Sequence, residues 1–196
     1  MSSSTQVTAP AIDPLLRERW SSRDFAPEHE LSAQDLEQLL EAARWSPSAG
    51  NSQPWAFLVL QRGTPEHARF VETLSAGNRG WVPTASAVLV SLFRVGDDED
   101  PNLTFSDYAA YDLGQAAAHL TVQAQAMGLG VRQFAGFDHA AVAAEFGVPA
   151  SWQVTTGIAV GRVLETEPPA DRPRVRKEIP EFVFAGAFGE PWSAAP

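Results

Sequence analysis

The sequence contains no cysteine, so disulfide bonds, thiolate-bound zinc or iron–sulfur centres and a cysteine nucleophile are all excluded. Redox chemistry would therefore need a bound cofactor. Positive charge is scarce as well: 14 Lys and Arg residues stand against 24 Asp and Glu residues, and the formal net charge is −10 at pH 7. This excess of negative charge argues against a general affinity for nucleic acid or for anionic membrane surfaces. An anionic ligand would need a locally basic pocket.

Other absences narrow the function further. No apolar run is long and uninterrupted enough to span a bilayer, and residues 1–13 lack the basic and apolar regions of a secretory signal. We therefore expect a cytoplasmic protein. The 4 histidines are isolated, without HExxH spacing, so no metal site is expected. Walker A, Rossmann GxGxxG and GxSxG motifs are also missing.

The remaining composition is that of one packed domain. A chain of 196 residues with 44% hydrophobic residues is long and apolar enough to form a core. Residues 1–12 are small and polar, and we expect them to be a flexible N-terminal segment. Residues 13–196 are predicted to form a single domain whose C-terminal arm, rich in proline, begins at about residue 165.

The clearest helix signal follows Leu31. Ser32 is a typical N-cap, Asp35 lies three positions further on, and Leu36 pairs with Leu31 across the cap. Pro47 is predicted to end this helix, because proline cannot continue a helical hydrogen-bond ladder.

The longest helix is predicted over residues 108–127, where apolar residues recur three and four positions apart. Its many alanines favour close packing against other helices, within the core or across a dimer interface. The remaining predicted helices cover residues 65–74 and 138–146, and the predicted strands cover 55–60, 85–93, 131–134 and 152–161. This order predicts an α+β domain with a small sheet between helices.

Half of the cations fall in two short windows. The first holds Arg17, Arg19 and Arg23, and the second holds Arg172, Arg174, Arg176 and Lys177. Because the planar guanidinium matches phosphate oxygens, two such windows folded together would hold a phosphate dianion. The alternative is that all of them are solvated surface residues.

Two further segments carry unusual composition. Residues 45–55, WSPSAGNSQPW, are dense in turn-forming and hydrogen-bonding residues and would press donors against a flat polar ring, although an ordinary helix-to-strand turn is the alternative. Residues 128–138, GLGVRQFAGFD, contain small residues that would let a ligand approach the main chain. A glycine pattern of this kind is weak on its own.

These segments together resemble a known family. ERWSSRDF at residues 18–25, followed by a capped helix and by SPSAGNSQPWAFLVL at residues 46–60, is similar to the amino-terminal signature of the nitroreductase family of FMN enzymes. The resemblance continues through GNRGW, YDLGQAAAHL, the FAGF segment and RVRKEIPEFV, and covers most of residues 14–184. It implies a nitroreductase-like fold: a small, mainly antiparallel central sheet flanked by helices, with an extended C-terminal arm.

The resemblance also implies which residues bind FMN. In the first flavin block, basic side chains approach the phosphate or the pyrimidine edge, and a second block runs along the ring, partly from the other subunit. A third contact is a frequent asparagine, a fourth is a main-chain stretch whose amide faces flavin N5, and the last is a pair of phosphate ligands in the tail. The first block is matched by Arg19, Trp20, Ser21 and Arg23, and the block along the ring is matched by Pro47, Ser48, Ala49, Asn51 and Gln53. Asn78 matches the asparagine, and Phe134, Ala135 and Gly136 match the main-chain stretch. Arg174 and Arg176 match the phosphate ligands of the tail.

One position departs from the pattern. Where some relatives carry a second lysine near the pyrimidine ring, this sequence has Trp81. We therefore expect either that Arg23 is the main charge stabilising the reduced flavin or that Trp81 narrows the acceptor pocket.

By this resemblance the chain is expected to be an oxidoreductase that moves hydride from NADH or NADPH, through bound FMN, to small acceptors such as nitroaromatics, quinones or activated alkenes, by ping-pong kinetics. A homodimer with FMN between the subunits is expected, with an interface built partly on residues 108–127. The alternatives are a flavin-binding sensor or carrier without turnover, a reductive dehalogenase or flavin-fragmenting relative, and a scaffold that binds no flavin.

Overall fold

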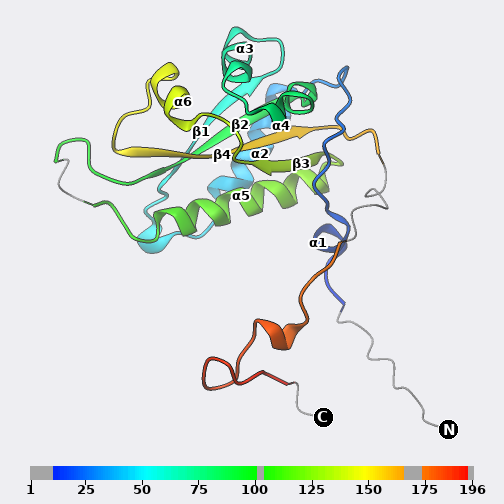
Figure 1. Cartoon of the computed structure of the whole chain (residues 1–196), viewed down its shortest axis with the longest axis vertical. Helices are drawn as coiled ribbons and strands as arrows, with labels where there is room; N and C mark the ends of the chain where they lie inside the picture. Colours follow the sequence, from blue (N-terminus) through cyan, green and yellow to red (C-terminus); the bar gives the residue numbers. More distant parts are fainter. Residues whose placement is uncertain (1–10, 101–103, 166–173, 194–196) are drawn as a thin grey trace. The chain divides into compact units, whose positions relative to one another are not determined.

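The computed structural model describes residues 11–100, 104–165 and 174–193. The chain divides into two compact units, Met1–Thr166 and Glu167–Pro196, and each is described by itself. Figure 1 shows the first unit as a sheet with helices on both of its faces. Within the described ranges, no helix combines the length and the apolar character needed to cross a membrane.

The sheet has four strands, all paired antiparallel. They are β1 (Trp55–Gln61), β2 (Ala87–Arg94), β3 (Gly130–Phe134) and β4 (Trp152–Gly161), in the order β1-β2-β4-β3. This confirms the predicted small antiparallel sheet. Because β3 lies at one edge, the residues that follow it reach the margin of the sheet, where main-chain groups are open to further partners.

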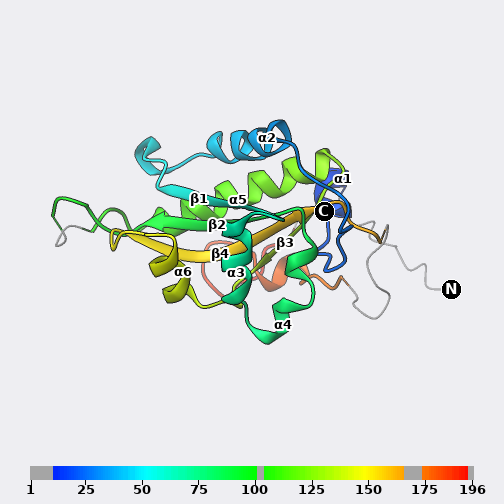
Figure 2. The same ribbon diagram turned by 90° about the horizontal axis from the view of Figure 1, so that it is seen from above.

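Two helices cover one face of the sheet, α2 (Ala33–Arg44) and α5 (Ala109–Ala126), and Figure 2 shows them on the same side. Leucines of α2 and alanines of α5 pack with the inward residues of the strands. The core cluster on this face of the sheet includes Leu36, Leu39, Ala43, Ala116, Ala117, Leu120, Ala124, Leu89, Ile158 and Val160. The small side chains of α5 let α2 and the sheet approach closely, as the alanine pattern predicts.

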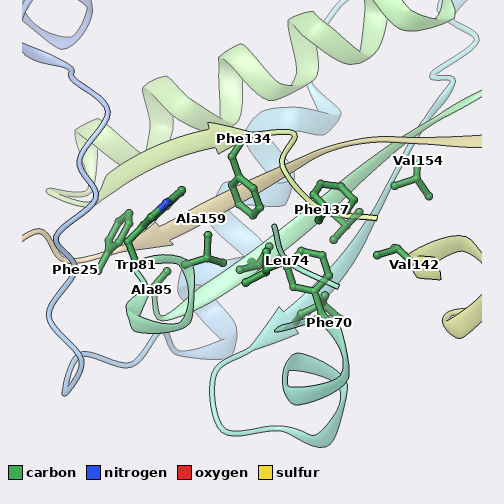
Figure 3. Packing of buried hydrophobic residues seen from close by; sticks show 14 of the residues in the cluster. Phe25, Phe70, Leu74, Trp81, Ala85, Phe134, Phe137, Val142, Val154 and Ala159 are labelled. Atoms are coloured by element: carbon green, nitrogen blue, oxygen red, sulfur yellow. The ribbon is translucent and has the colours of Figure 1, made fainter. Parts of the chain in front are cut away.

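Shorter helices cover the other face: α3 (Pro65–Glu72), α4 (Ala76–Arg79) and α6 (His139–Glu145). Aromatic rings fill this side of the core (Figure 3). The Trp81 ring stacks on Phe25 at 6.3 Å between centroids and meets Phe134 edge-on at 5.3 Å. Through these ring contacts, Trp81 connects the segment around Phe25 to β3.

The observed ends of most helices and strands differ from the predicted ends by a few residues. Helix α2 stops at Arg44 rather than at Pro47, because a residue that precedes proline, here Ser46, is disfavoured in helical conformation. Strand β2 begins at Ala87 rather than at residue 85, because the 3-10 turn Val82–Thr84 occupies the preceding residues. A short helix, α1 (Pro14–Glu18), begins the first unit.

The described part of the second unit, residues 174–193, has little regular structure. A 3-10 turn spans Ile179–Glu181, and an isolated antiparallel bridge joins Phe184 to Pro191. The rings of Phe184 and Phe188 lie 4.6 Å apart between centroids. The proline-rich stretch 166–173, which includes Arg172 of the second arginine window, lies outside the described residues.

Candidate functional site

The loop between α2 and β1 has a strained backbone. Gly50, Asn51 and Gln53 have φ angles of 60°, 55° and 48°. L-residues other than glycine rarely adopt this left-handed region, and such strain is concentrated at functional sites. The loop is closed by the Ser48 hydroxyl, which accepts the N–H of Gln53 at 3.0 Å. This geometry favours a ligand-binding loop over the ordinary turn that the sequence left open.

Two polar side chains of α5 hold this loop. The carboxylate of Asp112, only 2% exposed, accepts the N–H of Ala49 at 3.0 Å. The Gln115 amide donates to the Pro47 carbonyl at 3.4 Å and to the Asp112 carboxylate at 3.4 Å. Neither residue was predicted from the sequence to belong to the site. The position of Asp112 among the apolar residues of its helix could have indicated this role, because a buried carboxylate needs a hydrogen-bond partner.

A groove of about 240 Å³ lies where the loop meets α5. It is lined by Pro47, Ser48, Ala49, Tyr108, Tyr111, Asp112 and Gln115. Two of these residues, Tyr108 and Tyr111, are 62% and 68% exposed although aromatic. This end of α5 therefore presents an apolar surface beside the loop.

The first predicted flavin block lies against another part of α5. Arg19 follows α1, and its guanidinium donates to the Ser21 hydroxyl at 3.4 Å. Arg19 and Ser21 line a groove of about 380 Å³ together with Leu16, Ala118, Thr121, Val122, Val131 and Gln133. Trp20 is half-buried, and Arg23 is exposed. The groove therefore combines a guanidinium, a hydroxyl and an amide with an apolar wall.

Asn78 lies beside the residues that follow β3, as the predicted site requires. Its amide donates to the Gly136 carbonyl at 2.9 Å, and its side-chain oxygen accepts the indole N–H of Trp81 at 3.0 Å. A Cβ on Gly136 would lie 2.5 Å from the Asn78 amide nitrogen and 2.6 Å from the Ser75 hydroxyl. A side chain at position 136 would therefore require these two polar side chains to move.

The other two residues of this stretch differ in exposure. The Phe134 side chain is 8% exposed and belongs to the aromatic core, so only its main chain is free to face a ligand. Ala135 is exposed at the sheet edge. The side chain of Phe134 therefore packs in the core, while the main chain of Ala135 and Gly136 is the part for which a flavin contact is predicted.

Arg132, in β3, connects two of these segments. Its Nη1 donates to the Ser21 carbonyl at 2.7 Å, and its guanidinium carbon lies 5.3 Å from the centre of the Trp81 ring. This residue was not among those predicted from the sequence. Its place in a short strand that leads directly to Ala135 and Gly136 could have indicated a role in the site.

The two grooves occupy different positions along α5. The loop groove reaches Gln115 and the first-block groove begins at Ala118, so their nearest lining residues on α5 are about 4.5 Å apart along the helix axis. Arg174 and Arg176 are exposed and belong to the second unit. That the two arginine windows meet around one phosphate stays a prediction.

The resolved pKa shifts nearby concern surface and structural groups. Hydrogen bonds from Arg44 and Trp45 lower the pKa of the exposed Glu41 carboxyl to about 2. Burial lowers the pKa of His29, whose Nδ1 lies 2.9 Å from the Ser86 hydroxyl. Among the described residues, no group of three or more His, Asp or Glu side chains is arranged to hold a metal ion.

Sequence comparison identifies a family. A model described as the nitroreductase family matches residues 16–92 and 65–162. The chain is 26% identical over 190 residues to protein DrgA of Synechocystis sp., covering 83% of this chain and 89% of that protein. Other curated relatives, from Haemophilus influenzae and Bacillus subtilis, match over stretches that span only 27% to 35% of their own length.

Solved structures share the whole fold. An FMN-containing oxidoreductase of known crystal structure has a TM-score of 0.84 at 28% identity, covering 97% of this chain and 100% of that chain. A protein of Exiguobacterium sibiricum crystallised in complex with FMN has a TM-score of 0.75 at 20% identity, covering 90% and 99%. At such identity the second match shows the fold alone. Together they confirm the predicted nitroreductase-like α+β fold.

Proposed function

Because this chain belongs to the nitroreductase family, we propose that it is an FMN-dependent oxidoreductase that uses NADH or NADPH to reduce small electron-poor acceptors. Nitroaromatics, quinones and activated alkenes are the acceptor classes. The observation that carries the proposal is the convergence of Ser21, Asn78 and Gly136 around the end of the edge strand β3. When bound, FMN supplies a two-electron carrier that takes hydride from the nicotinamide and passes it to the acceptor.

The residues present fit this cofactor. A flavin mononucleotide needs cationic donors at its phosphate, neutral donors and acceptors along its ring, and a close approach to the main chain. Arg19 and Ser21 supply a guanidinium and a hydroxyl in one groove. Asn78 supplies an amide beside the main chain of Gly136, where a side chain would not fit. The donor set thus matches both ends of the molecule.

We assign the phosphate to Arg19 and Ser21, with Arg174 and Arg176 of the second unit as further ligands. Trp20 completes this block, and Arg23 provides positive charge towards the pyrimidine edge. Charge-assisted hydrogen bonds of this type contribute about 1.5–3 kcal/mol each. A locally basic site of this kind is what an anionic cofactor requires in a protein of net charge −10.

The ring is assigned to Asn78 and to the main chain of Ala135 and Gly136. Trp81 fixes the Asn78 side chain by donating its indole N–H to the amide oxygen. The Asn78 amide nitrogen in turn donates to Gly136. Side-chain orientation is thereby set before any ligand arrives, which lowers the cost of binding.

We also propose a homodimer in which the loop of one subunit completes the site of the other. Within one chain the loop of Pro47, Ser48, Ala49, Asn51 and Gln53 packs against an earlier part of α5 than the groove of Arg19 and Ser21 does. The exposed Tyr108 and Tyr111 beside the loop favour a second copy covering this surface. A two-fold axis near α5 would bring each loop to the partner's groove.

The chain's part in the chemistry is then positioning and charge stabilisation. The site uses no side-chain nucleophile and no metal ion. The nicotinamide and the acceptor occupy the same place in turn, so the kinetics are ping-pong. Residues 13–196, with their C-terminal arm, act together as one FMN-binding domain.

The decisive experiment compares FMN with riboflavin, which lacks the phosphate. Purified protein is expected to bind FMN, to lose its blue-region absorbance on adding NADH or NADPH, and to recover it with a quinone. Arg19→Ala is expected to weaken FMN binding about 10- to 150-fold while leaving riboflavin binding nearly unchanged. Arg44→Ala, on the exposed surface of α2, is the matched control.

Four results would contradict parts of the proposal. Protein that stays colourless after incubation with FMN has no flavin site. Bound flavin that reduced nicotinamides fail to bleach indicates a sensor or carrier without turnover. Equal losses of FMN and riboflavin affinity in Arg19→Ala remove the phosphate assignment. A stable, flavin-loaded monomer in size-exclusion chromatography would exclude the shared dimer site.

A further inference from the structure

We propose that Arg132 supplies a fixed positive charge that favours the reduced flavin, and this rests on the FMN site proposed above. The residue lies in the edge strand β3, opposite Ala159 of β4, two positions before Phe134. Its role would differ from that of the phosphate-binding arginines, because it acts on the redox state of the ring rather than on retention of the phosphate.

Two contacts with described residues hold the Arg132 side chain. Its Nη1 donates to the Ser21 carbonyl at 2.7 Å, which ties β3 to the first flavin block. Its guanidinium carbon lies 5.3 Å from the centre of the Trp81 ring, within the range of a cation–π contact. A half-buried guanidinium with two such contacts has few other orientations open to it.

The same contacts connect Arg132 to the first flavin block and to the segments of Asn78 and Gly136. Trp81, under the guanidinium, donates to the Asn78 side chain at 3.0 Å, and Asn78 donates to the Gly136 carbonyl at 2.9 Å. Arg132 therefore touches one flanking segment through Ser21 and is linked to the other two through Trp81 and Asn78. A ligand lying between these segments would have the guanidinium at its margin.

Two-electron reduction of a flavin places negative charge on the pyrimidine part of the ring, so a nearby fixed cation stabilises the reduced state more than the oxidised state. Arginine keeps its charge at every accessible pH. Arg23 is exposed, and water and salt screen its charge, whereas Arg132 is half-buried and oriented in advance. Trp81, which carries no charge itself, would thus serve as the platform for the cation.

The test measures the midpoint potential of bound FMN together with the dissociation constant of oxidised FMN. Arg132→Gln is expected to weaken the preference for reduced over oxidised flavin about tenfold, which lowers the two-electron midpoint potential by about 30 mV. Arg132→Lys, which keeps the charge, is expected to retain most of the wild-type potential. Arg69→Gln removes a cation of α3 that is paired with Glu145 of α6, and it should leave the potential unchanged.

Circular dichroism and thermal unfolding verify that each variant is folded. Arg132→Met keeps an unbranched, uncharged side chain that can still pack on the Trp81 ring, and it replaces the glutamine variant if that one does not fold. A wild-type potential in the neutral variants overturns the inference, as does a lysine variant that falls as far as the neutral ones. Both outcomes leave the FMN site intact, whereas wild-type protein that takes up no FMN would overturn the proposed function itself.

Discussion

The carboxylate of Asp112 accepts the main-chain N–H of Ala49 at 3.0 Å, across 63 positions of the chain. Asp112 lies in the first turn of α5, and Ala49 lies in the strained loop after α2. The contact fixes that loop to the longest helix of the fold. One buried carboxylate thereby determines where a distant segment of the chain lies.

Asp112→Ala should loosen the loop. The Ala49 N–H would lose its acceptor, at a cost of about 1–3 kcal/mol, which corresponds to a fall in Tm of roughly 2–12 °C for a domain of this size. Thermal unfolding and the flavin content of the purified protein measure the two effects. Asp107→Ala removes an exposed carboxylate just before α5 and serves as the control. Equal Tm values for the two variants would show that the anchor contributes nothing.

Gly136→Ala should damage the flavin site more than the fold. The added Cβ would lie 2.5 Å from the Asn78 amide nitrogen, so the side chain of Asn78 must move and its hydrogen bond to Gly136 must lengthen. Flavin affinity, measured by fluorescence titration, should fall about tenfold or more, as expected for loss of one such hydrogen bond. Gly77→Ala, in α4, meets nothing within 4 Å and should retain wild-type affinity.

His67 should make the protein less stable in mild acid. Burial lowers the pKa of this side chain from 6.5, the nearby charge of Arg62 lowers that pKa further, and Nε2 is buried without a hydrogen-bond partner. Because the folded pKa lies below the unfolded one, the unfolded state binds the proton first as pH falls. The stabilisation is complete above pH 6.5 and is lost as pH falls from there towards the folded pKa.

Denaturant unfolding between pH 5 and pH 8, a range set by the ordinary pKa of histidine at about 6.5, tests this directly. His67→Gln removes the titrating group and should flatten part of the slope. The pKa of His29 is lowered too, so some acid sensitivity will persist. A variant with the full wild-type slope would show that His67 does not contribute.

Ser32→Ala should destabilise α2 by about 1 kcal/mol, the usual cost of losing an N-cap. The Ser32 hydroxyl accepts the N–H of Asp35 at 3.1 Å and donates to its carboxylate at 2.7 Å. Gln34→Ala, at an exposed position of the same helix, is the control, and unfolding free energies are the measurement. If both variants unfold alike, the capping box has no measurable effect.

The Ser32 hydroxyl and main-chain N–H lower the pKa of Asp35 from 3.8. For a carboxyl whose folded pKa is depressed, the stabilisation is present above the unfolded pKa and is lost as pH falls through the folded one. The difference between Ser32→Ala and wild type should therefore shrink below about pH 3.8.

Much of the fold follows from local patterns. The N-cap signal at Ser32, the periodicity of residues 108–127 and the short apolar runs each predicted an element that the structure confirms, with ends shifted by a few residues. The motif pairing at residues 18–25 and 46–60 indicated the family that the family model confirms. Local signals suffice here because caps, prolines and apolar spacing act within a few residues.

The contacts that organise the candidate site were not predictable in the same way. Arg132 meets the Ser21 carbonyl across 111 positions, and Gln115 meets Pro47 across 68. Neither residue belongs to a sequence motif from which its hydrogen-bond partner could be predicted. An arginine or a glutamine is compatible with solvent at almost any surface position, so only the packing of β3 and α5 decides what each one contacts.

By itself the amino-acid sequence determined the class of fold, the helices and strands, the family and a set of residues suited to a phosphorylated flavin. Tertiary structure alone decided that β3 lies at the sheet edge, that Phe134 turns into the core while Gly136 meets Asn78, and that Asp112 holds the loop. The physical reason is range: helix caps and apolar periodicity are local interactions, whereas a buried polar group is satisfied by whichever distant segment the packed core brings to it.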